Sequence, residues 1–82
     1  MSTDGSTFRI YVASYCPYCT AAKDLLRRKG YAFEEIDVTH DFEARRELAQ
    51  RTGRRTVPQI FRGEEHIGGY DDLVRYFAEG AS

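Results

Sequence analysis

The chain has 82 residues, of which 41% are hydrophobic and 30% are charged, and its formal net charge is −1. This length suits one domain over residues 1–82, and the composition is that of a globular protein, not of a disordered one. The balance of 12 Lys and Arg against 13 Asp and Glu excludes a general basic field for nucleic acid or anionic membranes.

The N-terminal segment is polar, and we expect residues 1–7 to be a flexible lead-in to the fold. It has neither the basic start nor the apolar stretch of a secretory signal. No apolar run approaches the about 20 residues that span a bilayer. We therefore expect a cytoplasmic protein. We also expect a monomer, although no sequence feature determines the oligomeric state.

The alternation and spacing of apolar residues predict the element order β-α-β-α-β-β-α. Pro17 suits the first position of a helix, and Gly30 suits the residue just past its end. Asp41 can cap a second helix that stops at Gly53. The predicted strands cover 8–12, 33–38, 57–61 and 65–67, and the predicted helices cover 17–29, 42–52 and a last segment that starts at Asp71 or Asp72 and stops at Gly80.

This order predicts how the strands pair. A strand, helix and strand in succession give a parallel pair with a right-handed crossover, and the last two strands give an antiparallel hairpin. In the last helix, we expect Leu73, Val74 and Phe77 to share the apolar side. The fold class is therefore α/β, with a four-stranded mixed sheet flanked by three helices.

The strongest chemical signal is Cys16-Pro17-Tyr18-Cys19, at the junction of a strand and a helix. This spacing near a β-α-β unit is typical of redox pairs. Cys16 falls at the N-cap, where unpaired N–H groups and the helix dipole favour the thiolate, which is the nucleophilic form. Cys19 lies on the same side as the apolar helix positions, so we expect Cys16 to attack and Cys19 to resolve the mixed disulfide.

Two other interpretations of the cysteines are open. They can be ordinary buried residues that pack as small hydrophobes. They can also be half of a zinc site, which needs two more ligands. The chain offers only His40 and His66 for that purpose, and the two are not in a paired spacing.

Two further motifs are ambiguous by themselves. Thr56-Val57-Pro58 is a proline at the start of a strand, where either peptide isomer is possible. Gly68-Gly69-Tyr70-Asp71-Asp72 is a flexible turn that opens onto a helix N-terminus. Such an N-terminus can bind an anion, or the segment can be a simple turn with a cap.

Together, the three motifs resemble those of the dithiol glutaredoxins of short bacterial type, within the thioredoxin-fold superfamily. The resemblance covers about residues 8–78. It implies a minimal thioredoxin fold, a redox-active disulfide, and glutathione as the reductant, with no metal or other tightly bound cofactor. The implied activity is reduction of protein disulfides and of protein–glutathione mixed disulfides, in electron transport and cell redox homeostasis.

The resemblance also implies residue roles. Pro58 is expected to be cis and to face the cysteines, and the backbone of Val57 is expected to pair with the cysteinyl part of glutathione. Asp72 is expected to meet the α-amino group of the γ-glutamyl end, and Arg45 the glycyl carboxylate. The implied glutathione-binding residues are Tyr18, Arg45, Thr56, Val57, Pro58, Gly69, Tyr70, Asp71 and Asp72.

The chain departs from the family pattern at two positions. Many members carry Lys where this chain has Ala13, so Arg45 compensates or the thiolate and the carboxylate are less well stabilised. Many members have Cys where this chain has Tyr70.

Three functional alternatives follow from these observations. The first is a glutathione-dependent reductase whose protein partners, with ribonucleotide reductase among the candidates, the sequence does not name. The second is a glutaredoxin-like thioredoxin that a flavoprotein reduces, which the loss of Lys at Ala13 favours. The third is a glutathione-ligated [2Fe–2S] carrier, against which Pro17 argues because such relatives usually have Ser or Gly there.

Overall fold

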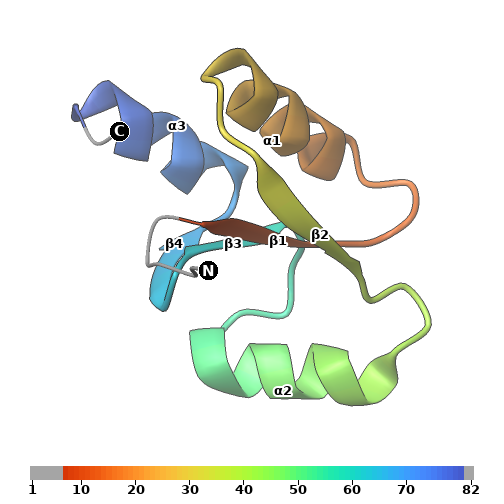
Figure 1. The fold of residues 1–82 in the computed structure, drawn as a ribbon. Helices are drawn as coiled ribbons and strands as arrows, with labels where there is room; N and C mark the ends of the chain where they lie inside the picture. Colours follow the sequence, from red (N-terminus) through yellow and green to blue (C-terminus); the bar gives the residue numbers. More distant parts are fainter. Residues whose placement is uncertain (1–6, 81–82) are drawn as a thin grey trace.

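The computed structural model describes residues 7–80, and its elements follow the predicted order (Figure 1). The prediction of a flexible lead-in falls, for residues 1–6, outside the described residues. The elements are β1 (Phe8–Val12), α1 (Pro17–Arg28), β2 (Phe33–Asp37), α2 (Phe42–Thr52), β3 (Gln59–Arg62), β4 (Glu65–Gly68) and α3 (Tyr70–Ala78).

The strands form one sheet in the order β2-β1-β3-β4. β1 is parallel to β2 and antiparallel to β3, and β3 and β4 are an antiparallel hairpin. The predicted mixed sheet is therefore confirmed. Figure 1 shows α1 and α3 on one face of the sheet and α2 on the other. This order sets the start of β3 beside the end of β1, where the cysteine loop begins.

The main core fills the space between the sheet and the pair α1 and α3. Its members are fully or nearly fully buried, because alternate residues of a strand point to the same face. They are Phe8, Ile10, Val12, Cys19, Ala22, Leu26, Ile60 and Leu73. Cys19 is thus part of the packed interior.

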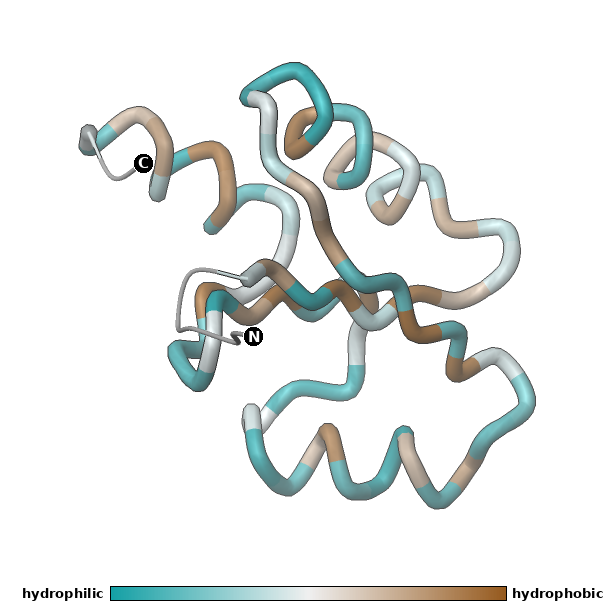
Figure 2. The backbone as a smooth tube through the Cα atoms, in the orientation of Figure 1, coloured by the Kyte–Doolittle hydropathy of each residue, from teal (hydrophilic) through white to brown (hydrophobic). Residues whose placement is uncertain are grey.

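The opposite face carries α2, which is mostly hydrophilic along its length (Figure 2). Leu48 is its buried residue, and Phe42 at its start is 75% exposed. The guanidinium of Arg51 lies over the ring of Phe61, 4.9 Å from its centre. This helix therefore presents charged side chains over much of its surface.

The predicted starts of α1 and α2 and the predicted end of α2 are confirmed, and each of them lies beside a capping residue. Pro17 is the first residue of α1, and Cys16 is its N-cap. The Asp41 carboxylate accepts a hydrogen bond of 3.0 Å from the N–H of Ala44, which starts α2. Gly53 ends α2 with a left-handed φ of 74°, a conformation that favours glycine.

Two predicted element starts and one residue assigned to the apolar side of a helix were wrong. β3 starts at Gln59 and not at residue 57, since Pro58 has no N–H to donate to the ladder. α3 begins at Tyr70 with Gly69 as its N-cap, because Asp72 reaches back to the Gly69 N–H from inside the first turn. Val74 is 42% exposed, so it does not share the buried side with Leu73.

Within residues 7–80, no helix is long and apolar enough to cross a membrane.

Candidate active site and ligand groove

Cys16 occupies the N-terminus of α1 as its N-cap. Its backbone is extended, and its sulfur accepts a hydrogen bond of 3.2 Å from the N–H of Cys19. The Cys16 carbonyl also accepts bonds from the amides of Cys19 and Thr20. The sulfur therefore lies at the positive, N-terminal end of the helix dipole and already accepts one backbone hydrogen bond.

The second cysteine has a different environment. Cys19 is only 2% exposed, whereas Cys16 is partly exposed, and both are free thiols. Burial, with a smaller contribution from a hydrogen bond to Cys16, raises the pKa of Cys19 to about 12. At neutral pH Cys19 is therefore a protonated, inaccessible thiol, which agrees with the expected division of roles.

The Val57–Pro58 peptide bond is cis, as the resemblance implies. The carbonyl oxygen of Val57 lies 3.6 Å from the sulfur of Cys16, within reach of an S–H···O contact. Val57 stands outside the sheet, and its amide has no hydrogen-bond partner among residues 7–80. An extended ligand can therefore pair with this amide while its sulfur lies beside Cys16.

A groove of about 350 Å³ opens next to this contact. Its walls come from the start of α1, the segment before β3 and the start of α3. The rings of Tyr18 and Tyr70 lie 6.0 Å apart, centre to centre, and flank it. The lining residues are Tyr18, Arg54, Thr56, Val57, Pro58, Gly69, Tyr70, Asp71 and Asp72.

Asp72 is the charged centre of the groove. One carboxylate oxygen accepts hydrogen bonds from Arg54 at 2.8 Å and from the Gly69 N–H at 2.9 Å, and the other accepts one from Arg75 at 3.1 Å. These bonds lower the pKa of Asp72, and the bond from Arg54 makes the largest contribution to the shift. Asp72 is thus ionised and held in one orientation at the N-terminus of α3.

A buried side chain supports the segment before β3. Gln59 is fully buried, and its amide donates a 2.9 Å hydrogen bond to the carbonyl of Thr56. Its oxygen lies 2.7 Å from Nε2 of His66. Burial lowers the pKa of His66, so the ring is neutral at pH 7 and can donate from Nε2. This chain of contacts fixes the residue that precedes Val57.

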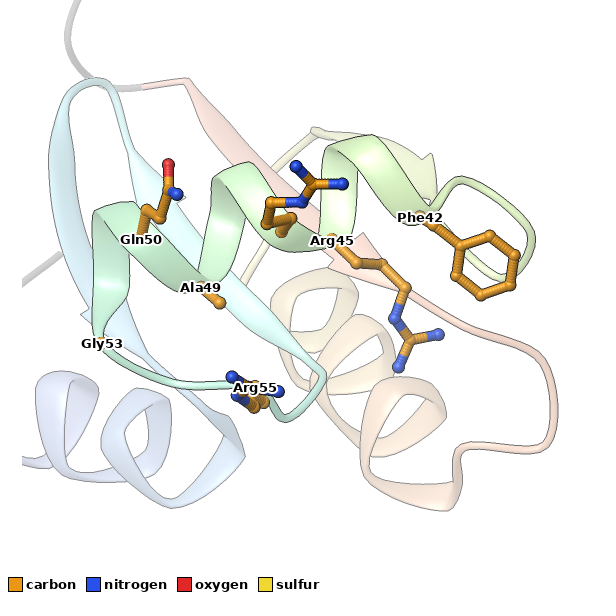
Figure 3. Close-up of a pocket in the computed structure, with 7 residues that line it drawn as sticks. Phe42, Arg45, Ala49, Gln50, Gly53 and Arg55 are labelled. Carbon is orange, nitrogen blue, oxygen red and sulfur yellow. The ribbon is translucent and has the colours of Figure 1, made fainter.

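The structure brings eight of the nine expected glutathione contacts into this groove and leaves one outside. Arg45 lies on α2 and lines a separate cavity, shown in Figure 3. Conversely, Arg54 lines the groove although it belongs to none of the three motifs. The sequence does not separate Arg54 from its neighbour Arg55. What distinguishes the two arginines is the ion pair between Arg54 and Asp72, which only the structure shows.

Ala13 stands where many glutaredoxins have a lysine, and the cavity that it lines has a lysine from another position, Lys23. The cavity is lined by residues of the cysteine loop together with Lys23 of α1. The ammonium of Lys23 is 2.9 Å from a carboxylate oxygen of Glu35, so its charge is already paired.

The fold and the dithiol pair place the chain among the thiol–disulfide oxidoreductases of the thioredoxin fold. The family model for glutaredoxin matches residues 8–67. The chain is 55% identical over 64 residues to a glutaredoxin of Pseudomonas aeruginosa, covering 78% of this chain and 76% of that protein. It is 48% identical over 71 residues to glutaredoxin 3 of Escherichia coli K12, covering 87% and 86%.

Solved structures give the same result. The solution structure of glutaredoxin from Brucella melitensis superposes with a TM-score of 0.80 at 50% identity, covering 90% of this chain and 80% of that one. A buckwheat glutaredoxin–glutathione complex superposes with a TM-score of 0.83 at 34% identity, covering 90% and 70%. This chain belongs to the glutaredoxin family, and its Cys16/Cys19 pair carries thiol–disulfide exchange.

Proposed function

We propose that this protein uses glutathione to reduce protein–glutathione mixed disulfides and protein disulfides. The observation that carries the proposal is the convergence of three distant segments on one groove beside Cys16. The buckwheat relative is described in complex with glutathione, which supports the same ligand for this groove.

Each part of glutathione has a counterpart in the groove. The amide of Val57 is free to pair with the cysteinyl backbone, as in the addition of a β-strand. The N-terminus of α3 suits the α-carboxylate, and the Asp72 carboxylate suits the α-amino group. The glycyl carboxylate has no cation in the groove besides Arg54, so the role of Arg45 stays a prediction.

With a mixed disulfide as substrate, the Cys16 thiolate attacks the glutathione sulfur. The S–S bond breaks, and the protein leaves as a thiolate that takes a proton. A second glutathione thiolate then attacks the glutathione sulfur on Cys16, which forms glutathione disulfide and restores the Cys16 thiolate. Cys19 is not required, which suits a thiol that is buried and protonated.

With a protein disulfide, Cys16 attacks one sulfur and forms a mixed disulfide with the protein. Cys19 gives up its proton and attacks the Cys16 sulfur, and the protein leaves as a dithiol. The Cys16–Cys19 disulfide that remains is reduced by two glutathiones, which leave as glutathione disulfide.

The test is reduction of the mixed disulfide of cysteine and glutathione, coupled to glutathione reductase and NADPH. We expect activity in the native protein and in Cys19→Ser, and only the uncatalysed rate in Cys16→Ser. If the native protein is inactive there but is reduced by a flavoprotein thioredoxin reductase, the glutathione proposal is wrong. Circular dichroism of each variant excludes unfolding as the cause of lost activity.

A further inference from the structure

The peptide unit between Thr56 and Val57 has its two polar groups in different surroundings. The carbonyl of Thr56 accepts a hydrogen bond of 2.9 Å from the side-chain amide of Gln59, which is fully buried. The N–H of Val57 has no hydrogen-bond partner among residues 7–80, and both residues line the groove beside Cys16. The protein therefore holds one end of this peptide unit and leaves the other end available to a ligand.

The geometry of a peptide unit links these two ends. The peptide bond between Thr56 and Val57 is trans. In a planar trans unit, the C=O and N–H bonds point in opposite directions. Because Gln59 holds the carbonyl of Thr56 toward the interior, the N–H of Val57 must point to the other side, where the groove lies.

Gln59, the first residue of β3, is the only buried polar side chain among residues 7–80. A buried amide is costly unless it is hydrogen-bonded, and both ends of this amide have partners. Its nitrogen contacts the carbonyl of Thr56 at 2.9 Å and the hydroxyl of Thr56 at 3.3 Å. Its oxygen lies 2.7 Å from Nε2 of His66. Gln59 is therefore a clamp on Thr56 that is fixed from both ends.

The carbonyl of Thr56 determines the direction of the hydrogen bonds in this clamp. A carbonyl can only accept, so the nitrogen of Gln59 must face Thr56 and its oxygen must face His66. That oxygen also can only accept, so Nε2 of His66 carries the proton. The ring of His66 lies 5.0 Å from that of Phe61, its partner in the hairpin. His66 thus donates the bond that keeps the amide of Gln59 from turning over.

We infer that Gln59, held by His66, is a positioning residue for glutathione: its clamp on the carbonyl of Thr56 aims the N–H of Val57 at the ligand. This inference rests on the proposed function and adds two residues to the machinery that selects glutathione. Neither side chain lines the groove, so both act through Thr56. An N–H that is oriented before binding reduces the order that the ligand has to create.

The experiment measures an equilibrium at Cys16 in the full chain with Cys19→Ser, where no internal disulfide can form. The Cys16 thiol reacts with glutathione disulfide and gives the mixed disulfide of Cys16 and glutathione together with one free glutathione. Bis(hydroxyethyl) disulfide reacts in the same way, but its adduct has no peptide group to pair with Val57. Mass spectrometry at equilibrium gives both constants, and their ratio measures what the groove contributes to the glutathione adduct.

Gln59→Met keeps the length of the side chain and removes its donor. We expect it to lower the constant for glutathione about fivefold, which corresponds to about 1 kcal/mol, the net contribution of one backbone hydrogen bond. The constant for bis(hydroxyethyl) disulfide should not change. Ile60→Val is the matched control, because Ile60 is the next residue of β3, is fully buried and takes no part in the clamp. It should leave both constants unchanged, and an unchanged ratio in Gln59→Met would overturn the inference.

His66 gives a second pair of variants that leaves Gln59 in place. His66→Phe keeps a ring against Phe61 without a donor, and it should lower the glutathione constant about two- to threefold. His66→Gln places an N–H where Nε2 stands and should restore the native value. Adding His66→Phe to Gln59→Met should cause no further loss, because His66 acts through Gln59. Equal constants for His66→Phe and His66→Gln would overturn the role of His66.

Two further outcomes are decisive. Nitrogen NMR of the native protein should show the proton of His66 on Nε2, and a proton on Nδ1 alone would overturn the assigned direction of the clamp. If the two disulfides give equal constants while Gln59 and His66 are intact, the groove does not bind glutathione, and the proposed function fails instead.

Discussion

Arg54 and Arg55 are consecutive residues, yet they line different cavities with opposite electrostatic character. Arg54 lines the groove and is bound to Asp72, whose carboxylate also holds Gly69 and Arg75. Arg55 lines the cavity of α2 and has no partner among residues 7–80. The groove is thus preorganised by internal ion pairs, whereas the guanidinium of Arg55 is not held by any side chain among residues 7–80.

The groove and the cavity of α2 therefore differ in how they can interact with a ligand. A fixed carboxylate and backbone donors recognise one small molecule of constant shape, because little order has to be created on binding. Unpaired, exposed guanidiniums attract anions through their charge and place little restriction on the shape of the anion. Four predictions test this contrast.

The largest effect is expected from Asp72→Asn, which removes the charge at the centre of the groove. A hydrogen bond to a charged group contributes about 1.5–3 kcal/mol, so the KM for glutathione should rise roughly 10- to 100-fold. Steady-state kinetics with varied glutathione measures this. Asp41→Asn, at the N-terminus of α2 outside the groove, is the control and should leave KM unchanged. An unchanged KM in Asp72→Asn would remove Asp72 from the proposed site.

Gly68→Ala should disturb the groove through its backbone. Gly68 has a φ of 126°, and a Cβ there would overlap the carboxylate of Asp72. We expect a loss of about 1–3 kcal/mol in the free energy of unfolding, measured in urea. Gly53→Ala has a left-handed φ too but open space around its Cβ position, so it should cost less. An equal loss at both positions would show that only the backbone conformation matters.

Arg54→Gln and Arg55→Gln should differ in how stability depends on pH. The lowered pKa of Asp72 stabilises the fold above the unfolded pKa of about 3.9, and this stabilisation is lost as pH falls through the folded value. Arg54 is the first cause of the shift. Arg54→Gln should therefore lose less stability between pH 7 and pH 2.

The difference should be at most about 1 kcal/mol, because the pair is partly exposed. Urea unfolding at the two pH values measures it. Arg55→Gln should behave like the native protein. Identical pH profiles for all three proteins would contradict the assigned pairing.

The smallest effect is expected from Gln50→Glu, which places a carboxylate in the cavity of α2 that Arg45, Arg46 and Arg55 line. A surface ion pair contributes about 0.2–1 kcal/mol, so stability should rise slightly and the gain should vanish in high salt. A destabilised variant would show that the cavity does not attract carboxylates.

Much of the fold was predictable because its signals are local. Proline at the start of α1, Asp41 and Gly53 around α2, and the alternating strands act through residues within a few positions. The same holds for Cys16 as an N-cap and for the burial of Cys19 on the inner side of α1. The wrong starts of β3 and α3 lie at the groove, where Pro58 cannot donate to the ladder and Asp72 caps α3 at Gly69 while it also pairs with Arg54.

The sequence by itself determined the element order, the dithiol pair and the resemblance to the glutaredoxin family, since each depends on short-range pattern. Only the tertiary structure decided which distant side chains meet. The strand order β2-β1-β3-β4 brings Val57 to Cys16, and the turn at Gly68 brings Asp72 to Arg54. Arg45 lines a cavity with Arg55 instead of the groove, because α2 packs on the face of the sheet opposite to α1 and α3. Such placements depend on contacts between residues far apart in the chain, which no local pattern encodes.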